Sequence, residues 1–211
     1  MRDLNDSNKI MEISKNERLP LDVLRLDVTD DNLIKESIGQ IYDKNNRIDA
    51  LINNAGYALA GLLEETSTEE IKAQFETNFF GAIKTMQSVI PIMRNQKSGK
   101  IVNITSMGGR IAIPLDPIYH GTKFALEGLS ECIRYELGLF NIKIILIELG
   151  VVGSNFWNNI DMANYSENRV DEVGDKIKAG IKAMTKKIKD PDKDLQAEYI
   201  KEKFKEDTKD Y

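Results

Sequence analysis

The chain has 211 residues and a formal net charge of -5, with 29 lysines and arginines against 34 aspartates and glutamates. This length suits a single domain, and a mildly acidic chain argues against nucleic-acid binding, which needs a basic surface. One cysteine, Cys132, and one histidine, His120, are too few for an internal disulfide or a Cys/His zinc site. No apolar run reaches the ~18–20 residues of a membrane helix, and the polar N-terminus does not resemble a secretory signal. The composition predicts a soluble, cytoplasmic protein without a membrane span.

Strand-like and helical patterns alternate through residue 150. Short runs rich in Val, Ile and Leu predict strands, and the amphipathic stretches between them predict helices. The predicted strands cover residues 23–28, 48–53, 100–105 and 142–147, and the predicted helices cover residues 4–17, 31–45, 67–94 and 117–140. Strands joined by helical crossovers run parallel, and continuous apolar runs indicate burial on both faces. The order predicts a doubly wound α/β fold, with a parallel sheet between two layers of helices.

The character of the chain changes after residue 160. Charged residues dominate there, and no further apolar strand is visible. One helical stripe remains, formed by Ile177, Ile181, Met184 and Ile188. We therefore expect residues 1–160 to form the α/β domain, and residues 161–211 to form a charged helical extension of it. The far edge of the sheet is then shortened.

Ligands of open α/β sheets bind beyond the carboxyl ends of the strands. Near these ends, Tyr119 and Lys123 are four residues apart, on one face of the predicted helix 117–140. A nearby ammonium favours the phenolate, and a tyrosine tuned in this way can exchange a proton with a carbonyl or alcohol oxygen. Ser106 follows the predicted strand 100–105, where its hydroxyl could bind the same oxygen. Taken singly, the pair is explained by chance and the serine by an ordinary loop.

Two further segments carry polar residues in suggestive places. Asn53-Asn54-Ala55-Gly56 ends the predicted strand 48–53, where asparagine and glycine also favour a simple turn. Asn78 lies in an apolar stretch of the predicted helix 67–94, although helix interiors disfavour asparagine. The simpler alternative for Asn78 is a core amide whose hydrogen bonds go to backbone groups.

Together these features resemble the classical short-chain dehydrogenases/reductases over about residues 1–156. The motifs occur in the family's order, as LDVTD at 26–30, NNAG at 53–56, NxxG at 78–81, a strand-end serine and YxxxK at 119–123. The resemblance implies a Rossmann-type fold and an NAD(P)(H)-dependent oxidoreductase. Such an enzyme transfers a hydride between a nicotinamide and a carbonyl or secondary alcohol, without a metal. The resemblance also implies a homodimer or homotetramer formed through the helices at about 68–94 and 117–140.

The resemblance implies a role for each matching residue. Tyr119 would be the general acid and base, and Lys123 would lower its pKa and hold the nicotinamide ribose. Ser106 would polarise the substrate carbonyl, and Asn78 would anchor a water that links Lys123 to solvent. The cofactor cleft would be lined by Asp27, Val28, Asn53, Ala55, Gly56, Gly150, Val152 and Ser154. His120 falls at a variable position of the motif, where we expect a helix-surface residue.

Arg2 bears on the choice of cofactor. In the family, a basic residue at the corresponding place pairs with the 2′-phosphate of NADP, so Arg2 favours NADP(H) over NAD(H). The alternative is a solvated terminal arginine. After Gly150, the apolar side chains of Val151, Val152, Phe156 and Trp157 favour an apolar substrate. The motifs leave the substrate's identity and the direction of the reaction open.

The family's glycine-rich TGxxxGxG turn is not found among the 14 glycines. Residues 1–4 resemble the end of the family's second strand. The resemblance therefore implies that a unit of ~35 residues is missing and that the fold is incomplete at its N-terminus. A fragment, a misplaced start and a degenerate relative all fit this reading. The alternative function is that of a catalytically inactive relative that acts through oligomer or partner contacts.

Overall fold

The computed structural model describes residues 4–112, 116–150 and 161–163. The helical elements are η1 (Leu4–Ser7), α1 (Asn8–Glu17), α2 (Asp31–Asn45), α3 (Thr68–Phe75), the π-helical turn η2 (Glu76–Phe80), α4 (Gly81–Gln96), the 3-10 turn η3 (Met107–Gly109) and α5 (Pro117–Gly138). The strands are β1 (Ala50–Asn53), β2 (Leu59–Ala60), β3 (Gly99–Ser106), β4 (Ile142–Leu149) and β5 (Asp161–Met162). The predicted strands at 48–53, 100–105 and 142–147 are confirmed within a few residues at each end.

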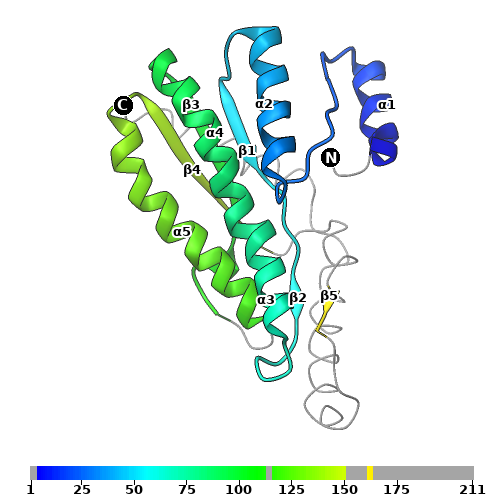
Figure 1. The fold of residues 1–211 in the computed structure, drawn as a ribbon, viewed down its shortest axis with the longest axis vertical. Helices are drawn as coiled ribbons and strands as arrows, with labels where there is room; N and C mark the ends of the chain where they lie inside the picture. The colour runs from blue at the N-terminus through cyan, green and yellow to red at the C-terminus, as the bar shows by residue number, and fades with distance from the viewer. Residues whose placement is uncertain (1–3, 113–115, 151–160, 164–211) are drawn as a thin grey trace.

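Strands β1, β3 and β4 form a parallel sheet in the order β1-β3-β4 (Figure 1). Asn53 pairs with Asn103, and Ser106 pairs with Leu149. Because the strands are parallel, their carboxyl ends meet at one edge of the sheet. This edge therefore carries the polar residues that the sequence placed at strand ends, and the parallel α/β class is confirmed.

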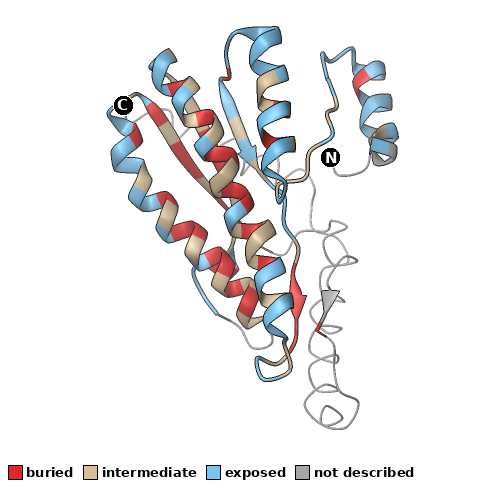
Figure 2. Cartoon of the chain, in the orientation of Figure 1, coloured by how far each residue is buried: buried red, intermediate tan, exposed pale blue. Residues whose placement is uncertain are grey.

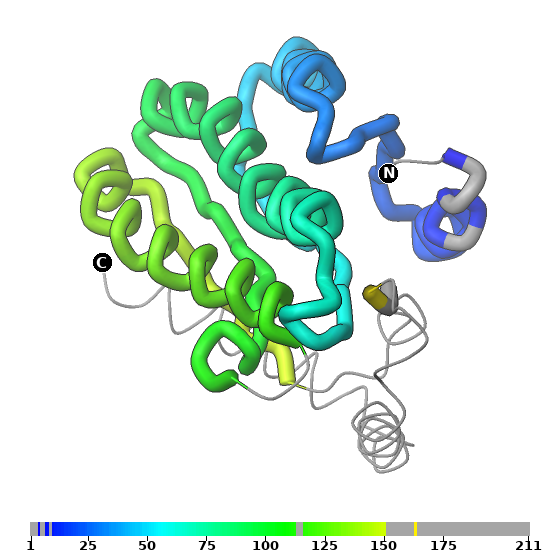
Figure 3. Tube along the Cα trace, turned by 60° about the horizontal axis from the view of Figure 1, so that its bottom comes forward, coloured from blue at the N-terminus to red at the C-terminus, as the bar shows by residue number. Residues whose placement is uncertain are grey.

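Helices α4 and α5 pack on one face of this sheet, and α2 packs against α4 (Figures 1 and 3). The inward sides of these helices are buried and their outward sides are exposed (Figure 2). The core between the two layers contains Met86, Val89, Met93, Ile101, Leu126, Ile142 and Ile144. Val102, Ile145 and Ile147 are buried on the opposite face of the sheet. The described residues thus show one layer of helices on this three-stranded sheet, and the second helical layer of a doubly wound fold stays a prediction.

The predicted helix 67–94 is present but interrupted. Ser67 and Glu70 form a capping box at its start, in which the Glu70 amide donates to Ser67 Oγ and the Ser67 amide donates to the Glu70 carboxylate. The π-helical turn η2 then separates α3 from α4. Such turns insert one residue into a helix and often occur at functional sites.

The prediction of a strand at residues 23–28 is wrong for the described structure. No described strand exchanges backbone hydrogen bonds with this segment, which runs as an irregular stretch beside α2 (Figure 1). Ser37 Oγ of α2 donates to the Arg25 carbonyl at 3.0 Å. Val28 packs on Gly81 so closely that a Cβ there would lie 2.7 Å from Val28 Cγ2. The apolar run therefore reflects packing against helices and not pairing in the sheet.

A second, two-stranded sheet joins β2 to β5 in parallel. The Ala163 amide extends the pairing by donating to the Ala60 carbonyl at 2.9 Å. Each strand has two residues, which is too short to leave an alternating pattern in the sequence. The strand after residue 160 was therefore not predicted, and its pairing with β2 joins residues 161–163 to the α/β domain.

A chain of buried polar side chains connects the sheet to the helices. Asn53 Nδ2 of β1 donates to Asn103 Oδ1 of β3 at 2.8 Å, and Asn103 Nδ2 donates to Ser130 Oγ of α5 at 2.8 Å. On the other side, Thr85 Oγ1 of α4 donates to Asn53 Oδ1 at 2.7 Å. The exposed fraction of both Asn103 and Ser130 is 0%. These bonds give each amide the partners that burial requires.

Candidate active site

The Tyr119–Lys123 pair lies in the first turns of α5, which begins with Pro117. The fixed φ of proline suits the first helical position. Lys123 Nζ lies 5.7 Å from the centroid of the Tyr119 ring. The Lys123 side chain is buried, and its ammonium donates to the Ile104 carbonyl of β3 at 2.9 Å. The predicted pair therefore faces the carboxyl end of β3.

Burial lowers the pKa of Lys123 to about 8, and the nearby Glu127 carboxylate opposes this shift. The side chain is therefore mostly an ammonium at neutral pH. An ammonium carries three hydrogens, and Ile104 is the hydrogen-bond acceptor that the described residues provide to it. The two other N–H groups suit the hydroxyls of a ligand. A nicotinamide ribose, which offers hydroxyl groups, fits this requirement.

The pKa of Tyr119 is raised above its ordinary value of 10. Burial of the phenol is the largest cause, and the Asp116 carboxylate adds to it, whereas a hydrogen bond with the Ser106 side chain opposes it. Lys123 is not among the causes of this shift, so its expected lowering of the pKa of Tyr119 stays a prediction. The effect of Ser106 on the pKa of Tyr119 nevertheless indicates that the two predicted residues lie close together.

Ser106 is the last residue of β3 and caps η3. Its Oγ accepts a hydrogen bond from the Gly108 amide at 3.0 Å. Gly150, directly after β4, lies against this turn, since a Cβ at Gly150 would be 3.7 Å from Met107 Sδ. The structure thus brings Gly150 and Ser106 to the same edge, as expected for a site built on strand ends.

Asn78 lies in η2 and is buried. Its Oδ1 accepts from the Tyr57 amide at 3.0 Å, and its Nδ2 donates to the Tyr57 carbonyl at 2.8 Å and to Thr122 Oγ1 at 3.2 Å. A Cβ at Gly56 would be 3.1 Å from Asn78 Oδ1. Asn78 therefore fastens the NNAG segment to the residue before Lys123. The simpler reading of a core amide describes these bonds, and the water-anchoring role stays a prediction.

The other predicted cofactor residues have varied surroundings, and some lie outside the described residues. Asp27 Oδ1 accepts from both the amide and the hydroxyl of Thr29, which forms a tight turn before α2. Val28 contacts Gly81, and Asn53 belongs to the buried polar chain. Ala55 and Gly56 are exposed. Outside the described residues lie Arg2, Val152 and Ser154, the apolar segment after Gly150, and the stripe from Ile177 to Ile188.

His120 was expected on the helix surface, and that prediction is wrong. Its side chain is 6% exposed, and its Nδ1 lies 2.7 Å from the Gly108 carbonyl oxygen. The reason is that η3 folds back onto the start of α5, as the contacts between these elements show. A single sequence gives no signal for this contact, because it joins residues from two different elements.

Sequence reasoning also missed a charged cluster beside the site. The guanidinium of Arg110 forms ion pairs with Glu127, Glu131 and Glu148 at 3.1, 3.2 and 3.0 Å. Glu127 is one turn after Lys123 and is buried, and this burial raises the pKa of its carboxyl. The cluster therefore places the Glu127 carboxylate, whose charge Arg110 partly compensates, one helical turn from Lys123. Only the spacing of Glu127 and Glu131 within α5 hinted at it.

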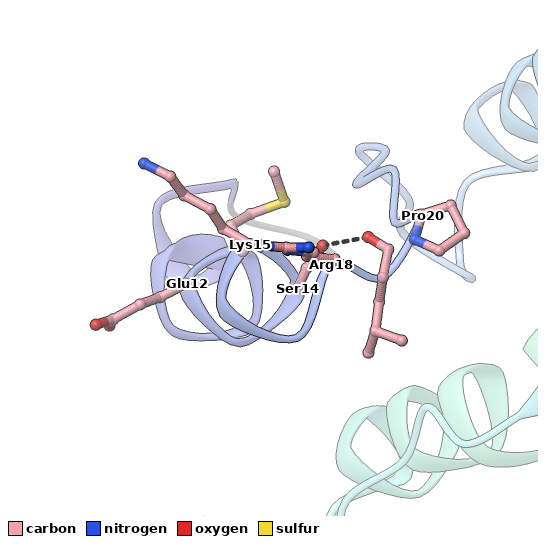
Figure 4. A pocket seen from close by; sticks show the side chains of 7 residues that line it. Glu12, Ser14, Lys15, Arg18 and Pro20 are labelled. Atoms are coloured by element: carbon pink, nitrogen blue, oxygen red, sulfur yellow. Dashed lines mark hydrogen bonds between the residues drawn. The ribbon is translucent and has the colours of Figure 1, made fainter.

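A hollow elsewhere on the molecule is not part of this site. It lies beside α1 and is lined by Met11, Glu12, Ser14, Lys15, Arg18, Leu19 and Pro20 (Figure 4). Within it, Ser14 Oγ donates to the Leu19 carbonyl at 2.8 Å. None of the predicted site residues lines it. In the described part of the chain, no helix is long and apolar enough to cross a membrane, and no group of His, Cys, Asp and Glu is arranged to hold a metal ion.

Comparison with known proteins identifies the class. The family model for short chain dehydrogenases matches residues 2–164, so the chain belongs to the short-chain dehydrogenase family. The match covers the parallel sheet, the NNAG segment, Asn78, Ser106 and the Tyr119–Lys123 pair.

Three curated relatives are similar over most of the chain. A probable short-chain type dehydrogenase/reductase VdlC from Helicobacter pylori is 36% identical over 81% of this chain and 64% of its own length. A 3-ketodihydrosphingosine reductase from Bacteroides thetaiotaomicron is 38% identical over 71% of this chain and 55% of its own. Human retinol dehydrogenase 8 is 37% identical over 74% of this chain and 50% of its own length. The chain therefore spans half to just under two thirds of the length of these relatives.

Solved structures agree on the fold. A short-chain dehydrogenase from Streptomyces avermitilis has a TM-score of 0.72 at 29% identity, covering 82% of this chain and 64% of its own. ElxO with NADP bound has a TM-score of 0.70 at 26% identity, covering 81% and 82%. An NAD+-bound xylitol dehydrogenase has a TM-score of 0.70 at 24% identity, covering 74% and 60%, and this likeness shows the fold alone. Similar structures thus include proteins bound to NADP and to NAD+.

Proposed function

We propose that this protein is a nicotinamide-dependent oxidoreductase that interconverts a carbonyl and a secondary alcohol. The observation that carries the proposal is the grouping of Ser106, Tyr119 and Lys123. The Ser106 side chain acts to lower the pKa of Tyr119, which places it close to the phenol, and the buried Lys123 ammonium lies beside the same tyrosine ring. Membership of the short-chain dehydrogenase family and the names of its relatives support the same activity. A chain freed from catalysis need not keep all three residues, which disfavours the inactive alternative.

The geometry suggests how the residues divide the work. The bound cofactor supplies or accepts the hydride. In the reduction, the Ser106 and Tyr119 hydroxyls both donate to the carbonyl oxygen, and Tyr119 passes its proton to that oxygen as the alcohol forms. The raised pKa keeps Tyr119 protonated at neutral pH, which suits the acid role. Lys123 holds the ribose through the N–H groups that Ile104 leaves available. The oxidation runs through the same groups in reverse.

The activity is tested with the purified full chain, NADPH or NADH, and a panel of apolar and polar ketones and aldehydes. Cofactor oxidation should depend on both the protein and the carbonyl compound. The matched control is Ser106→Ala, which removes the hydroxyl that donates to the substrate carbonyl. Alanine is also small, so the end of β3 should keep its structure. If the wild type binds a cofactor but reduces no compound of the panel faster than Ser106→Ala does, the result would count against the proposal.

We extend the proposal to NADP(H) as the preferred cofactor. Its support is the basic side chain of Arg2, since a 2′-phosphate pairs well with a guanidinium. Arg2→Asp should weaken NADPH binding about tenfold and leave NADH binding unchanged or improved. Titration of both cofactors measures the ratio of their dissociation constants. Arg18→Asp makes the same change in charge at the end of α1, and it should leave the ratio alone. An unmoved ratio in Arg2→Asp would remove the role of Arg2.

The substrate is proposed to be apolar. The segment after Gly150 is rich in Val, Phe and Trp, and two relatives are named for compounds with long hydrocarbon portions, 3-ketodihydrosphingosine and retinol. Within the panel, kcat/KM should rise with the apolar surface of the carbonyl compound. A preference for small sugars would point to a different substrate class.

A homodimer or homotetramer through the long helices is also proposed. Phe124, Tyr135 and Leu139 lie along the outward side of α5, and the exposed fractions of Tyr135 and Leu139 are 82% and 84%. Apolar side chains gathered on one exposed helix side often mark a protein interface. Tyr135→Asp should shift the sedimentation mass toward that of one chain, because it places a charge in the buried contact. The control is Leu63→Asp, which alters another exposed apolar residue away from α5. A wild type that sediments as one chain would contradict the proposal.

The cytoplasm is the proposed location. The chain has one cysteine, Cys132, which is exposed and forms no disulfide in the structure, and reducing compartments keep such thiols free. Fractionation of the source cells tests this location, and recovery of the protein outside the cytoplasmic fraction would contradict it.

A further inference from the structure

The start of α5 holds the end of β3 and the turn after it through several side chains. Lys123 binds the Ile104 carbonyl, and Tyr119 lies close to Ser106, which acts to lower the pKa of the phenol. His120 reaches the turn itself, through the carbonyl of Gly108. The first two contacts belong to the site described above. The contact of His120 has no role in the proposed mechanism, although it is made by a buried side chain next to Tyr119.

The contact between His120 and Gly108 has a defined polarity. The His120 Nδ1 lies 2.7 Å from the Gly108 carbonyl oxygen. A carbonyl oxygen can only accept, so Nδ1 carries the hydrogen and donates it. The approach also depends on glycine, because a Cβ at position 108 would lie 2.8 Å from Nδ1. The ring is thus fixed in orientation, packed edge-on to Tyr119 with 6.0 Å between the centroids.

The same glycine binds Ser106 through its amide. The Gly108 N–H donates to Ser106 Oγ at 3.0 Å. This bond occupies one lone pair of the hydroxyl oxygen and leaves its hydrogen to donate elsewhere. Donation toward Tyr119 agrees with the effect of Ser106, which favours the ionised form of the phenol. His120 therefore holds the carbonyl of Gly108, and the amide of the same glycine orients the Ser106 hydroxyl.

We propose that His120 is a positioning residue that sets the direction of the Ser106 hydroxyl by holding the Gly108 carbonyl. The inference rests on the proposed function, since it assigns His120 an effect on the proton and carbonyl chemistry of Ser106 and Tyr119. The competing explanation is packing alone, in which the imidazole fills space between η3 and α5. The two explanations differ in what a side chain of similar size without a donor would do.

The experiment compares His120→Asn with His120→Leu in the full chain, using NADPH and a carbonyl compound that the wild type reduces. The asparagine amide can present an N–H close to the position of Nδ1, whereas leucine has a similar volume and no donor. We expect His120→Leu to lower kcat about tenfold, with KM and NADPH affinity little changed. His120→Asn should stay within about threefold of the wild type. Equal kcat values in the wild type and the leucine variant would overturn the proposal.

A double-mutant cycle tests whether the effect passes through Ser106. In a Ser106→Ala background, the change His120→Leu should cause little further loss of kcat, since the hydroxyl that it orients is gone. A second loss of the same size in that background would show that His120 acts by packing or on Tyr119 directly, and would overturn the proposal. If His120→Leu does not fold, His120→Ala removes the same donor without an added branched side chain, and the cycle is run with it.

Amide hydrogen exchange gives a readout that needs no substrate. Loss of the His120 bond should speed exchange of the Gly108 amide about tenfold in the leucine variant and not in the asparagine variant. Unchanged exchange in both variants would overturn the proposal even if the protein proved inactive. Conversely, if no carbonyl compound is reduced but Gly108 exchange responds as expected, the proposed function fails and the positioning contact stands.

Discussion

Replacing Tyr119 with phenylalanine is expected to lower kcat for carbonyl reduction by ~10³-fold, while NADPH affinity stays within about twofold of the wild type. The change removes the hydroxyl whose pKa Ser106 acts to lower, and which carries the transferred proton in the proposed reduction. It keeps the aromatic ring beside the Lys123 ammonium. Because the ring and the lysine remain, the binding of the cofactor's ribose should survive the loss of the proton donor.

Steady-state kinetics and a fluorescence titration of NADPH measure the two quantities separately. The control is Tyr135→Phe, which removes the hydroxyl of a tyrosine on the exposed side of the same helix and should leave kcat unchanged. Turnover by Tyr119→Phe at the wild-type rate would falsify the assigned acid. A parallel loss of cofactor affinity would instead show that the hydroxyl helps to bind the cofactor.

Replacing Lys123 with methionine is expected to abolish efficient turnover and, at the same time, to stabilise the fold. The ammonium is buried, and its pKa of about 8 lies below its ordinary value of 10.5. Burying this charge therefore lowers the free energy of unfolding at neutral pH. Lys123→Met removes that cost but also loses the hydrogen bond to Ile104, so the variant should be more stable by a net amount on the order of 2 kcal/mol. The variant loses the cation that holds the ribose, so kcat/KM should fall by ~10²-fold or more.

The pH dependence of stability follows from the same pKa. Between about 8 and 10.5, the unfolded chain binds the lysine proton more tightly than the folded chain, so the contribution of Lys123 to stability rises with pH in this window. Below pH 8, the cost is present in full. The free energy of unfolding should therefore differ most between the wild type and Lys123→Met near neutral pH, and the gap should narrow as the pH approaches 10.5.

Urea unfolding at several pH values measures this gap. Lys84→Met is the matched control, because Lys84 forms ion pairs with Asp31 and Glu76 that raise its pKa. That replacement should be neutral or destabilising at neutral pH. If Lys123→Met and the wild type are equally stable at every pH, the buried ammonium carries no cost.

NADPH affinity of the wild type should also weaken as the pH rises through about 8.

The parts of the fold that depend on neighbouring residues were predictable from the sequence. The capping box of Ser67 and Glu70 and the one-turn spacing of Tyr119 and Lys123 are local patterns, and the structure contains both. The strand at 142–147 is an almost uniformly apolar run, interrupted only by Lys143, and such a run is recognisable without its neighbours. These features need no knowledge of what the chain packs against.

The features that escaped prediction depend on contacts between distant segments. The run at 23–28 has the composition of a strand, but the Arg25 carbonyl accepts from Ser37 of α2 and Val28 packs on Gly81, and the run does not join the sheet. The π-helical turn around Asn78 reflects its bonds to Tyr57 and Thr122. His120 is buried only because η3 folds over α5. The raised pKa of Tyr119 depends on burial, which the spacing of the motif does not reveal.

The buried chain from Thr85 through Asn53 and Asn103 to Ser130 also controls how the strands align. A slip of β3 by one residue would turn Asn103 to the opposite face of the sheet, among apolar side chains such as Ile145. The buried amide of Asn103 would then lose its partners, at a cost of ~1–3 kcal/mol for each of its groups left unpaired, and the half-buried Asn53 would lose its bond to Asn103. The network thus stabilises the observed register of β1 and β3 over a shifted one. It fixes Asn53 and Ser106, at the ends of two different strands, at a constant offset along the sheet, so that an error in pairing would cost the protein its stability as well as its site.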